Sequence, residues 1–183
     1  MANWTNVTRE PETGLPTMLV QAVSIAFVMC VCELVSAVGG AFALMPWFLV
    51  ACLFAVAFVY TVGFVLLWAA DSFAARLKRR DALMPLIYAV IGCVGFGIWG
   101  YCVYPATMNS IITRAGLATL SQGDSLMIGI NCAVVGLAAF FLGTAAMPRV
   151  MKSKGRIAVT AAAVIALAVF GGVVLAMTWS HLA

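Results

Sequence analysis

Charged side chains are scarce in this sequence. They make up 9% of its 183 residues, whereas apolar residue types make up 65% and the mean hydropathy is +1.13. A soluble domain carries roughly 25% charged residues, and a small globule leaves much of its surface in contact with water. No soluble fold of this size can hide so much apolar surface. The scarcity of charge therefore predicts a protein embedded in lipid.

The sequence also lacks the motifs of common enzymes. It contains no phosphate-binding G-x-x-x-x-G-K-[ST], no zinc-binding H-E-x-x-H and no nucleophile elbow G-x-S-x-G. The one histidine, His181, stands near the C-terminus, which excludes haem held by paired histidines. The segments between the apolar runs are too short for a nucleotide-binding domain. We expect no cofactor, and no enzyme that acts alone.

A secretory signal is missing from the start of the chain. Residues 1–16 are polar and mixed in charge, without a basic stretch followed by a short apolar core. We expect them to remain as a cytoplasmic N-terminal segment. The net charge is +4, but the basic residues lie in short clusters beside apolar runs. Such clusters are typical of topology signals, so we expect no nucleic-acid partner.

Long apolar runs are what the sequence does contain. A helix needs about 20 apolar residues to cross the hydrocarbon core, and lipid cannot satisfy an open backbone, so each run must be a helix. The runs are apolar all round, which excludes the alternating strands of a barrel. We predict an all-α integral membrane protein with a single transmembrane domain over residues 17–183. Its five expected spans are residues 17–38, 47–70, 86–107, 125–147 and 157–179.

Prolines support these boundaries. Pro16, Pro46 and Pro85 each stand at or just before an expected helix start, where a missing N–H costs little. Pro148 follows the fourth run and is expected to end it. Pro105 alone lies inside a span, in the last turn of the third, and predicts a kink or an early end there.

The basic residues predict the orientation. With five crossings, nine of the ten Lys and Arg residues fall on one side and only Arg114 falls on the other. The positive-inside rule places the nine in the cytoplasm, so we expect the N-terminus inside and the C-terminus outside. The compact loops and the missing signal favour the inner (cell) membrane. The nine residues are Arg9, Arg76, Lys78, Arg79, Arg80, Arg149, Lys152, Lys154 and Arg156.

Small residues recur on the third and fifth spans. Close backbone contact between helices in lipid requires such residues, although glycine and alanine are also simply common in membrane helices. Glycine weakens a helix unless packing needs it, so the third span is the better case. The expected packing residues are Gly92, Gly95, Gly97 and Gly100 on the third span, and Ala168, Gly172 and Ala176 on the fifth.

Glu33 is the one ionisable residue inside an expected span. An acid within the membrane is a functional hypothesis by default, so Glu33 predicts a proton or cation site. The alternative is a structural acid bonded to a polar neighbour. Asn131, Tyr101 and Tyr104 are the candidate neighbours, because all three are expected in the outer half of the membrane. A lone acid in the first span resembles the small multidrug-resistance transporters, which are shorter, have four spans, and share no other motif with this chain.

Six cysteines and ten methionines suggest redox or metal chemistry, but their placement does not favour it. The only close thiol pair, Cys30 and Cys32, lacks the C-x-x-C spacing of thiol oxidoreductases. The methionines are spread evenly between the two interfaces. We interpret the cysteines as small buried apolar residues and expect no metal site. A thiol oxidoreductase would instead require a reversible disulfide.

Two functional hypotheses remain. The first is a non-catalytic subunit or accessory protein of a membrane complex, with a protein partner or further copies of itself in the bilayer. The second is a small transporter or permease component that uses Glu33 as its proton or cation site.

Overall fold

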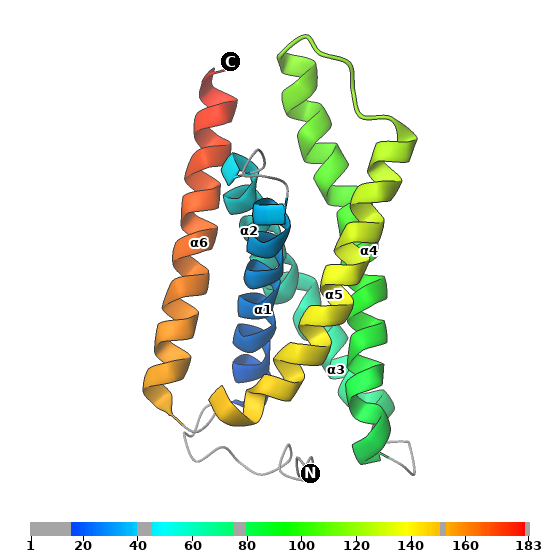
Figure 1. The fold of residues 1–183 in the computed structure, drawn as a ribbon, viewed down its shortest axis with the longest axis vertical. Coiled ribbons are helices and arrows are strands. Elements are labelled where there is room, and N and C mark those ends of the chain that lie inside the picture. The colour runs from blue at the N-terminus through cyan, green and yellow to red at the C-terminus, as the bar shows by residue number, and fades with distance from the viewer. Residues whose placement is uncertain (1–15, 40–44, 75–79, 151–152, 182–183) are drawn as a thin grey trace.

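The computed structural model describes residues 16–39, 45–74, 80–150 and 153–181. This part of the chain is helical and has no strands (Figure 1). Five helices are long and apolar enough to cross a membrane, which confirms the predicted number of spans. The elements are α1 (Thr17–Gly39), α2 (Met45–Phe58), η2 (Val59–Gly63), α3 (Phe64–Ala74), α4 (Arg80–Arg114), α5 (Gln122–Val150) and α6 (Lys154–His181).

Of the two proline expectations, the helix end at Pro148 was wrong, and at Pro105 the early end was wrong whereas a kink remains compatible with the structure. Helix α4 does not end early at Pro105 but continues to Arg114, although Figure 1 shows it changing direction along its length. Likewise, Pro148 does not stop α5, which continues to Val150. A proline removes one backbone hydrogen bond and bends a helix, but membrane helices tolerate it where neighbours and local adjustments satisfy the freed carbonyl. The predicted spans are therefore correct in number but too short at several ends.

The second span is one continuous helical rod with a π-helical turn in its middle. Helices α2 and α3 are joined directly by η2, and Thr61 donates a hydrogen bond to the carbonyl of Ala57 at 2.6 Å. A π turn inserts an extra residue and shifts the register of side chains on either side. Phe58, the residue just before this turn, is fully buried, with its ring centroid 5.0 Å from that of Phe96 and 6.4 Å from that of Phe140.

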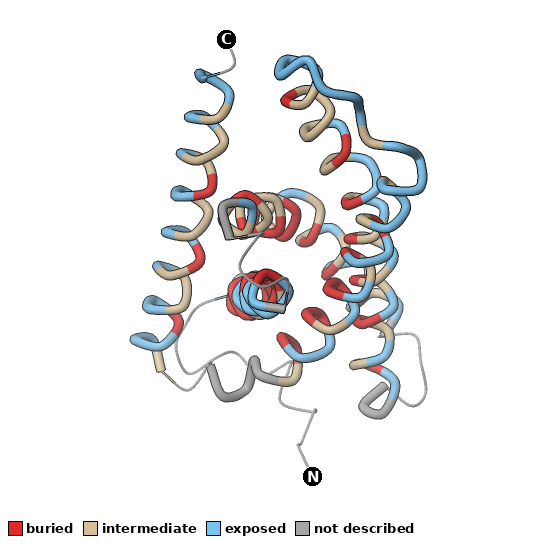
Figure 2. The backbone as a smooth tube through the Cα atoms, turned by 45° about the horizontal axis from the view of Figure 1, so that its top comes forward, coloured by how far each residue is buried: buried red, intermediate tan, exposed pale blue. Residues whose placement is uncertain are grey.

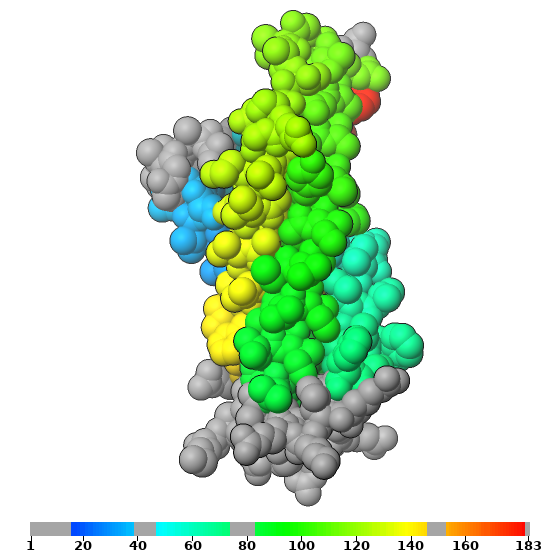
Figure 3. Space-filling model, turned by 90° about the vertical axis from the view of Figure 1, so that its right-hand side faces the viewer, coloured from blue at the N-terminus to red at the C-terminus, as the bar shows by residue number. Residues whose placement is uncertain are grey.

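Helices α4 and α5 form an antiparallel hairpin with the most extensive helix–helix contact in the described chain (Figure 3). Helix α1 packs against α5, α2 and α6, so it is central to the bundle, whereas α6 packs mainly on α2 and α1. Figure 2 shows buried positions scattered thinly along α6. In its membrane window 17% of α6 is buried, against 56% of α1, which makes α6 the peripheral helix.

The loop between α4 and α5 is held by local contacts at one end of the molecule. Gly116 has φ of +70°, a left-handed conformation that suits glycine at a helix C-terminus. The hydroxyl of Ser121 accepts a hydrogen bond from the backbone N–H of Asp124 at 3.2 Å, and the Asp124 carboxylate accepts one from the Ser121 N–H at 3.0 Å. This reciprocal capping begins α5. At the same end, the Arg114 guanidinium lies 4.3 Å from the ring centroid of Trp179 on α6.

Candidate functional site around Glu33

Glu33 points into the bundle. Its side chain is 8% exposed, and the residues that share its helical face, Ala22, Ala26, Met29 and Cys30, are all buried. The opposite face of α1 carries exposed apolar side chains, including Val31 and Val35. The small residues beside Glu33 let the neighbouring helices approach closely. The acid therefore faces protein rather than lipid.

Four helices contribute to the surroundings of Glu33. Its carboxyl group interacts electrostatically with Cys30 of α1, Cys52 of α2, Tyr104 of α4 and Cys132 of α5. Cys30, Cys52 and Cys132 all belong to the buried core of the bundle. All the cysteines of the described chain are free thiols. The result is a buried cluster of three thiols, one carboxyl group and one phenol.

The carboxyl group of Glu33 has no hydrogen bond or ion pair with any described residue. Tyr104, a candidate donor in the same cluster, instead donates a hydrogen bond from its hydroxyl to the carbonyl of Ala51 at 3.2 Å. A buried carboxylate without a partner carries a desolvation cost of several kcal/mol. The arrangement can hold a proton, because protonation removes the buried charge.

The structure separates the candidate neighbours of Glu33. Tyr104 lies in the same cluster, with its ring packed on Phe54 at a centroid distance of 4.8 Å. Tyr101 is 42% exposed on α4. Asn131 is exposed on α5 and has no hydrogen-bond partner in the described chain. Asn131 and Tyr101 therefore lie on the outer surface, away from the cluster.

The glycines of the third expected span lie at close contacts. A Cβ on Gly92 would collide with the ring of Phe140, and one on Gly136 of α5 would collide with the carbonyl of Gly92. At Gly100 an added Cβ would lie 2.5 Å from both Cβ and Sγ of Cys132.

The other two glycines of this span are also in contact with neighbours. A Cβ on Gly97 would lie 3.0 Å from Cβ of Ala133, and a Cβ on Gly95 would meet the side chain of Leu66 on α3. Glycine thus allows the two helices of the hairpin to touch backbone to backbone.

On α6 the close contact falls one residue away from the expected one. A Cβ on Gly171 would meet the carbonyl of Leu49 on α2, whereas nothing lies within 4 Å of one on Gly172. Ala168 packs partly against the core, and Ala176 is exposed. Within the described chain there is no close contact at Gly172, and Ala176 is exposed, so their close packing, expected either inside the chain or with a partner subunit, stays a prediction. The inward side of α6 is marked instead by its buried residues Ile157, Val164 and Gly171, at spacing seven.

Sequence reasoning missed two polar contacts between helices. Gln21 of α1 donates a hydrogen bond to the hydroxyl of Thr144 on α5 at 3.1 Å, and both residues are 2% exposed. The fully buried Tyr88 donates to the Asp71 carboxylate at 2.6 Å. Asp71 thus lies within the second membrane helix, two residues from the end of its candidate span at Phe73. Polar residues inside apolar runs were the available signal, since each needs a partner in lipid.

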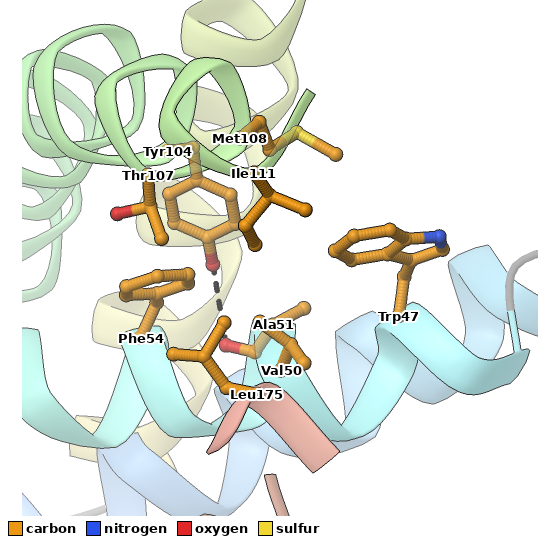
Figure 4. Close-up of a pocket in the computed structure, with 9 residues that line it drawn as sticks. All are labelled: Trp47, Val50, Ala51, Phe54, Tyr104, Thr107, Met108, Ile111 and Leu175. Carbon is orange, nitrogen blue, oxygen red and sulfur yellow. Dashed lines mark hydrogen bonds between the residues drawn. The ribbon is translucent and has the colours of Figure 1, made fainter. Parts of the chain in front are cut away.

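A small cavity adjoins the cluster on the side of Tyr104 (Figure 4). Its volume is about 70 Å³, far below the roughly 300–1,000 Å³ of ordinary ligand pockets. Apart from the hydroxyls of Tyr104 and Thr107, the lining side chains are apolar, and such cavities tend to stay dry. The lining residues are Trp47, Val50, Ala51, Phe54, Tyr104, Thr107, Met108, Ile111 and Leu175.

Comparison with protein families, curated proteins and solved structures finds no match for this chain. Its five long apolar helices are compatible with a multi-pass membrane protein.

Proposed function

We propose that this chain is a non-catalytic, multi-pass subunit of the inner (cell) membrane that associates with a second copy of itself through the outward face of α5. Its N-terminus lies in the cytoplasm and its C-terminus outside, as the nine-to-one division of basic residues indicates. The observation that carries the proposal is the placement of Asn131.

Asn131 presents an amide to the lipid. It lies nine residues into α5, about 13 Å along the helix axis at 1.5 Å per residue. It is exposed, and none of its donors or acceptors is used within the described chain. In hydrocarbon an unpaired amide is costly, and such side chains commonly hydrogen-bond across to another helix. The exposed amide supports a contact with a further transmembrane helix.

The surface around Asn131 has the spacing of a helix–helix seam. On the exposed side of α5, large apolar side chains recur at alternating steps of three and four residues. Asn131 follows one of them, Ile130, directly in the sequence. Such spacing lets two helices pack along their length. The row consists of Met127 (67% exposed), Ile130 (51%), Val134 (62%), Leu137 (45%) and Phe141 (44%).

A second copy is the occupant that this surface fits. An asparagine amide carries both a donor and an acceptor, so two copies of Asn131 can satisfy each other. A two-fold axis brings the same patch of both chains together and needs no second kind of protein. The described seam carries no charge that would call for an oppositely charged partner.

Energy transfer between two fluorescently labelled pools of the protein in the same lipid vesicles tests this proposal. Asn131→Val should weaken association by roughly 1 kcal/mol, which is about a fivefold rise in the dissociation constant. Asn131→Gln keeps the amide and should retain most of the association.

Matched tryptophan substitutions locate the interface. Val134→Trp enlarges the seam and should reduce transfer strongly, whereas Val169→Trp on the exposed face of α6 should not. Equal transfer in wild type, Asn131→Val and Val134→Trp would refute the α5 interface. Co-purification of an unrelated protein in place of a second copy would refute self-association.

A second candidate function is a small transporter or permease component that uses Glu33. The unpaired carboxyl group, buried among Cys52, Cys132 and Tyr104, favours it. The small apolar cavity beside Tyr104 is poorly suited to a hydrated ion, which is why this candidate stands second. Glu33→Gln separates the two, because glutamine keeps the shape but cannot titrate.

A further inference from the structure

A cation–π pair lies just beyond the small apolar cavity between α2, α4 and α6. Ile111 lines this cavity from α4, and Arg114 follows it three residues later. Leu175 lines it from α6, and Trp179 follows four residues later. Residues at these spacings share one face of a helix, and α4 and α6 run toward the same end of the molecule (Figure 1). The contact between Arg114 and Trp179, at 4.3 Å, therefore joins the two helices about one turn beyond the cavity.

The guanidinium group of Arg114 is available to an anion. Arg114 is exposed, and it has no hydrogen bond or ion pair with another described residue. Stacking on the Trp179 ring uses a face of the planar group and leaves the N–H donors at its edge free. Asp124, an acid at the same end, already accepts hydrogen bonds from the N–H and the hydroxyl of Ser121. Because the guanidinium fork matches phosphate geometry, Arg114 suits a phosphate group.

The cavity itself suits an alkyl chain. Its lining is almost entirely apolar, and Trp47 at its edge is 37% exposed, so the cavity reaches the surface of the bundle (Figure 4). An apolar cavity of roughly 150 Å³ holds a benzene ring, and by that measure about 70 Å³ holds roughly three chain carbons. Part of an acyl chain therefore fits, whereas a hydrated group does not.

The cation and the cavity lie in the order that a phospholipid requires. A lipid headgroup lies at the interface, and its chains extend into the hydrocarbon core. Arg114 is the last residue of its candidate span, and Trp179 lies two residues from the end of its own, whereas the cavity lies further inside. Tryptophan is also enriched at this depth of a membrane.

Charge decides between kinds of headgroup. A zwitterionic headgroup carries a cation of its own, which would lie close to Arg114 where Asp124 is already occupied. We propose that Arg114 and the cavity together bind one anionic phospholipid, with its phosphate on the guanidinium group and part of an acyl chain in the cavity. This site does not depend on the proposed association through α5.

Photocross-linking of the full-length protein in nanodiscs tests the site. The probes are phosphatidylglycerol and phosphatidylcholine with the same acyl chains, each with a light-activated diazirine on one chain. Mass spectrometry then identifies the labelled residues. In the wild type, phosphatidylglycerol should label cavity residues such as Met108 and Leu175. Its yield there should exceed that of phosphatidylcholine roughly fivefold, which corresponds to about 1 kcal/mol, the usual attraction of one basic residue for anionic lipid.

Two pairs of matched variants separate the headgroup from the chain. Arg114→Gln should lower the phosphatidylglycerol yield to that of phosphatidylcholine, whereas Lys154→Gln, which removes a charge at the opposite end of α6, should not. Ala51→Leu fills the cavity and should reduce the yield of both lipids there. Ala166→Leu makes the same change at an exposed position of α6 and should reduce neither.

The proposal is refuted by either of two results. Equal yields for the two lipids in the wild type, or an unchanged yield in Arg114→Gln, would exclude the contact with an anionic headgroup. Labels spread evenly over exposed positions such as Val134 and Val169 would exclude the cavity as the place of the chain. Should Ala51→Leu fail to fold, this map of labelled residues in the wild type decides instead.

Discussion

At the scale of single residues, the burial of Glu33 follows from its neighbours along α1. Small residues share its face, and that face packs inward. Which polar group lies near the acid could not be derived in the same way. Of the three candidates on other helices, Tyr104 turns inward, whereas Tyr101 and Asn131 turn outward. The rotation of each of those helices about its own axis decides this, and the rotation depends on packing.

We expect Glu33→Gln to fold and to associate as the wild type does. No described hydrogen bond to the carboxyl group is lost, and the cost of burying an ionisable group is removed. The melting temperature in detergent should stay the same or rise by roughly 2–4 °C, which corresponds to about 1 kcal/mol for a chain of this size. A variant that folds and associates normally but has lost ion or substrate flux in vesicles would instead favour the transporter candidate.

At the scale of the helices, glycine decides where two of them touch. The hairpin of α4 and α5 depends on Gly92 and Gly136, where backbone lies against backbone. On α6 the sequence offered two adjacent glycines, and the spacing with Ala168 and Ala176 favoured Gly172. In the structure Gly171 makes the close contact with α2 instead. It belongs to the buried residues of α6, Ile157, Val164 and Gly171, which recur every seven positions.

The two glycines of α6 form a matched pair for mutation. In Gly171→Leu the new side chain meets the backbone of Leu49, and overpacking of this kind costs roughly 1–3 kcal/mol or more. Gly172→Leu adds the same side chain in open space, so we expect little change. Melting of both variants in detergent checks the difference. Equal destabilisation by the two substitutions would contradict the contact between α6 and α2.

At the scale of the whole molecule, the start of α1 and the end of α6 lie at opposite ends of the helical bundle (Figure 1). The described loop from Ala115 to Ser121, which carries Thr119, lies at one end, and Ser153, just before α6, lies at the other. From the charge asymmetry we predict that the end with Ser153 faces the cytoplasm.

Thiol labelling in intact cells tests this orientation. In a background without native cysteines, a cysteine at Thr119 should react with a membrane-impermeant reagent, whereas one at Ser153 should react only after the cells are opened. Both positions lie outside the membrane windows, so neither substitution should disturb packing. Labelling at 153 in intact cells without labelling at 119 would reverse the topology.

The sequence by itself determined that five helices are long and apolar enough to cross a membrane, because the length and polarity of each apolar run are local properties of the sequence. It also located the unusual acid and the glycine-rich helix. The tertiary structure alone decided which sides of these helices meet. The spans are apolar nearly all round, so no polar face orients them. Their rotation is set by close contacts between distant segments, such as Gly136 on Gly92. Those contacts turned Asn131 outward and selected Gly171 over its neighbour.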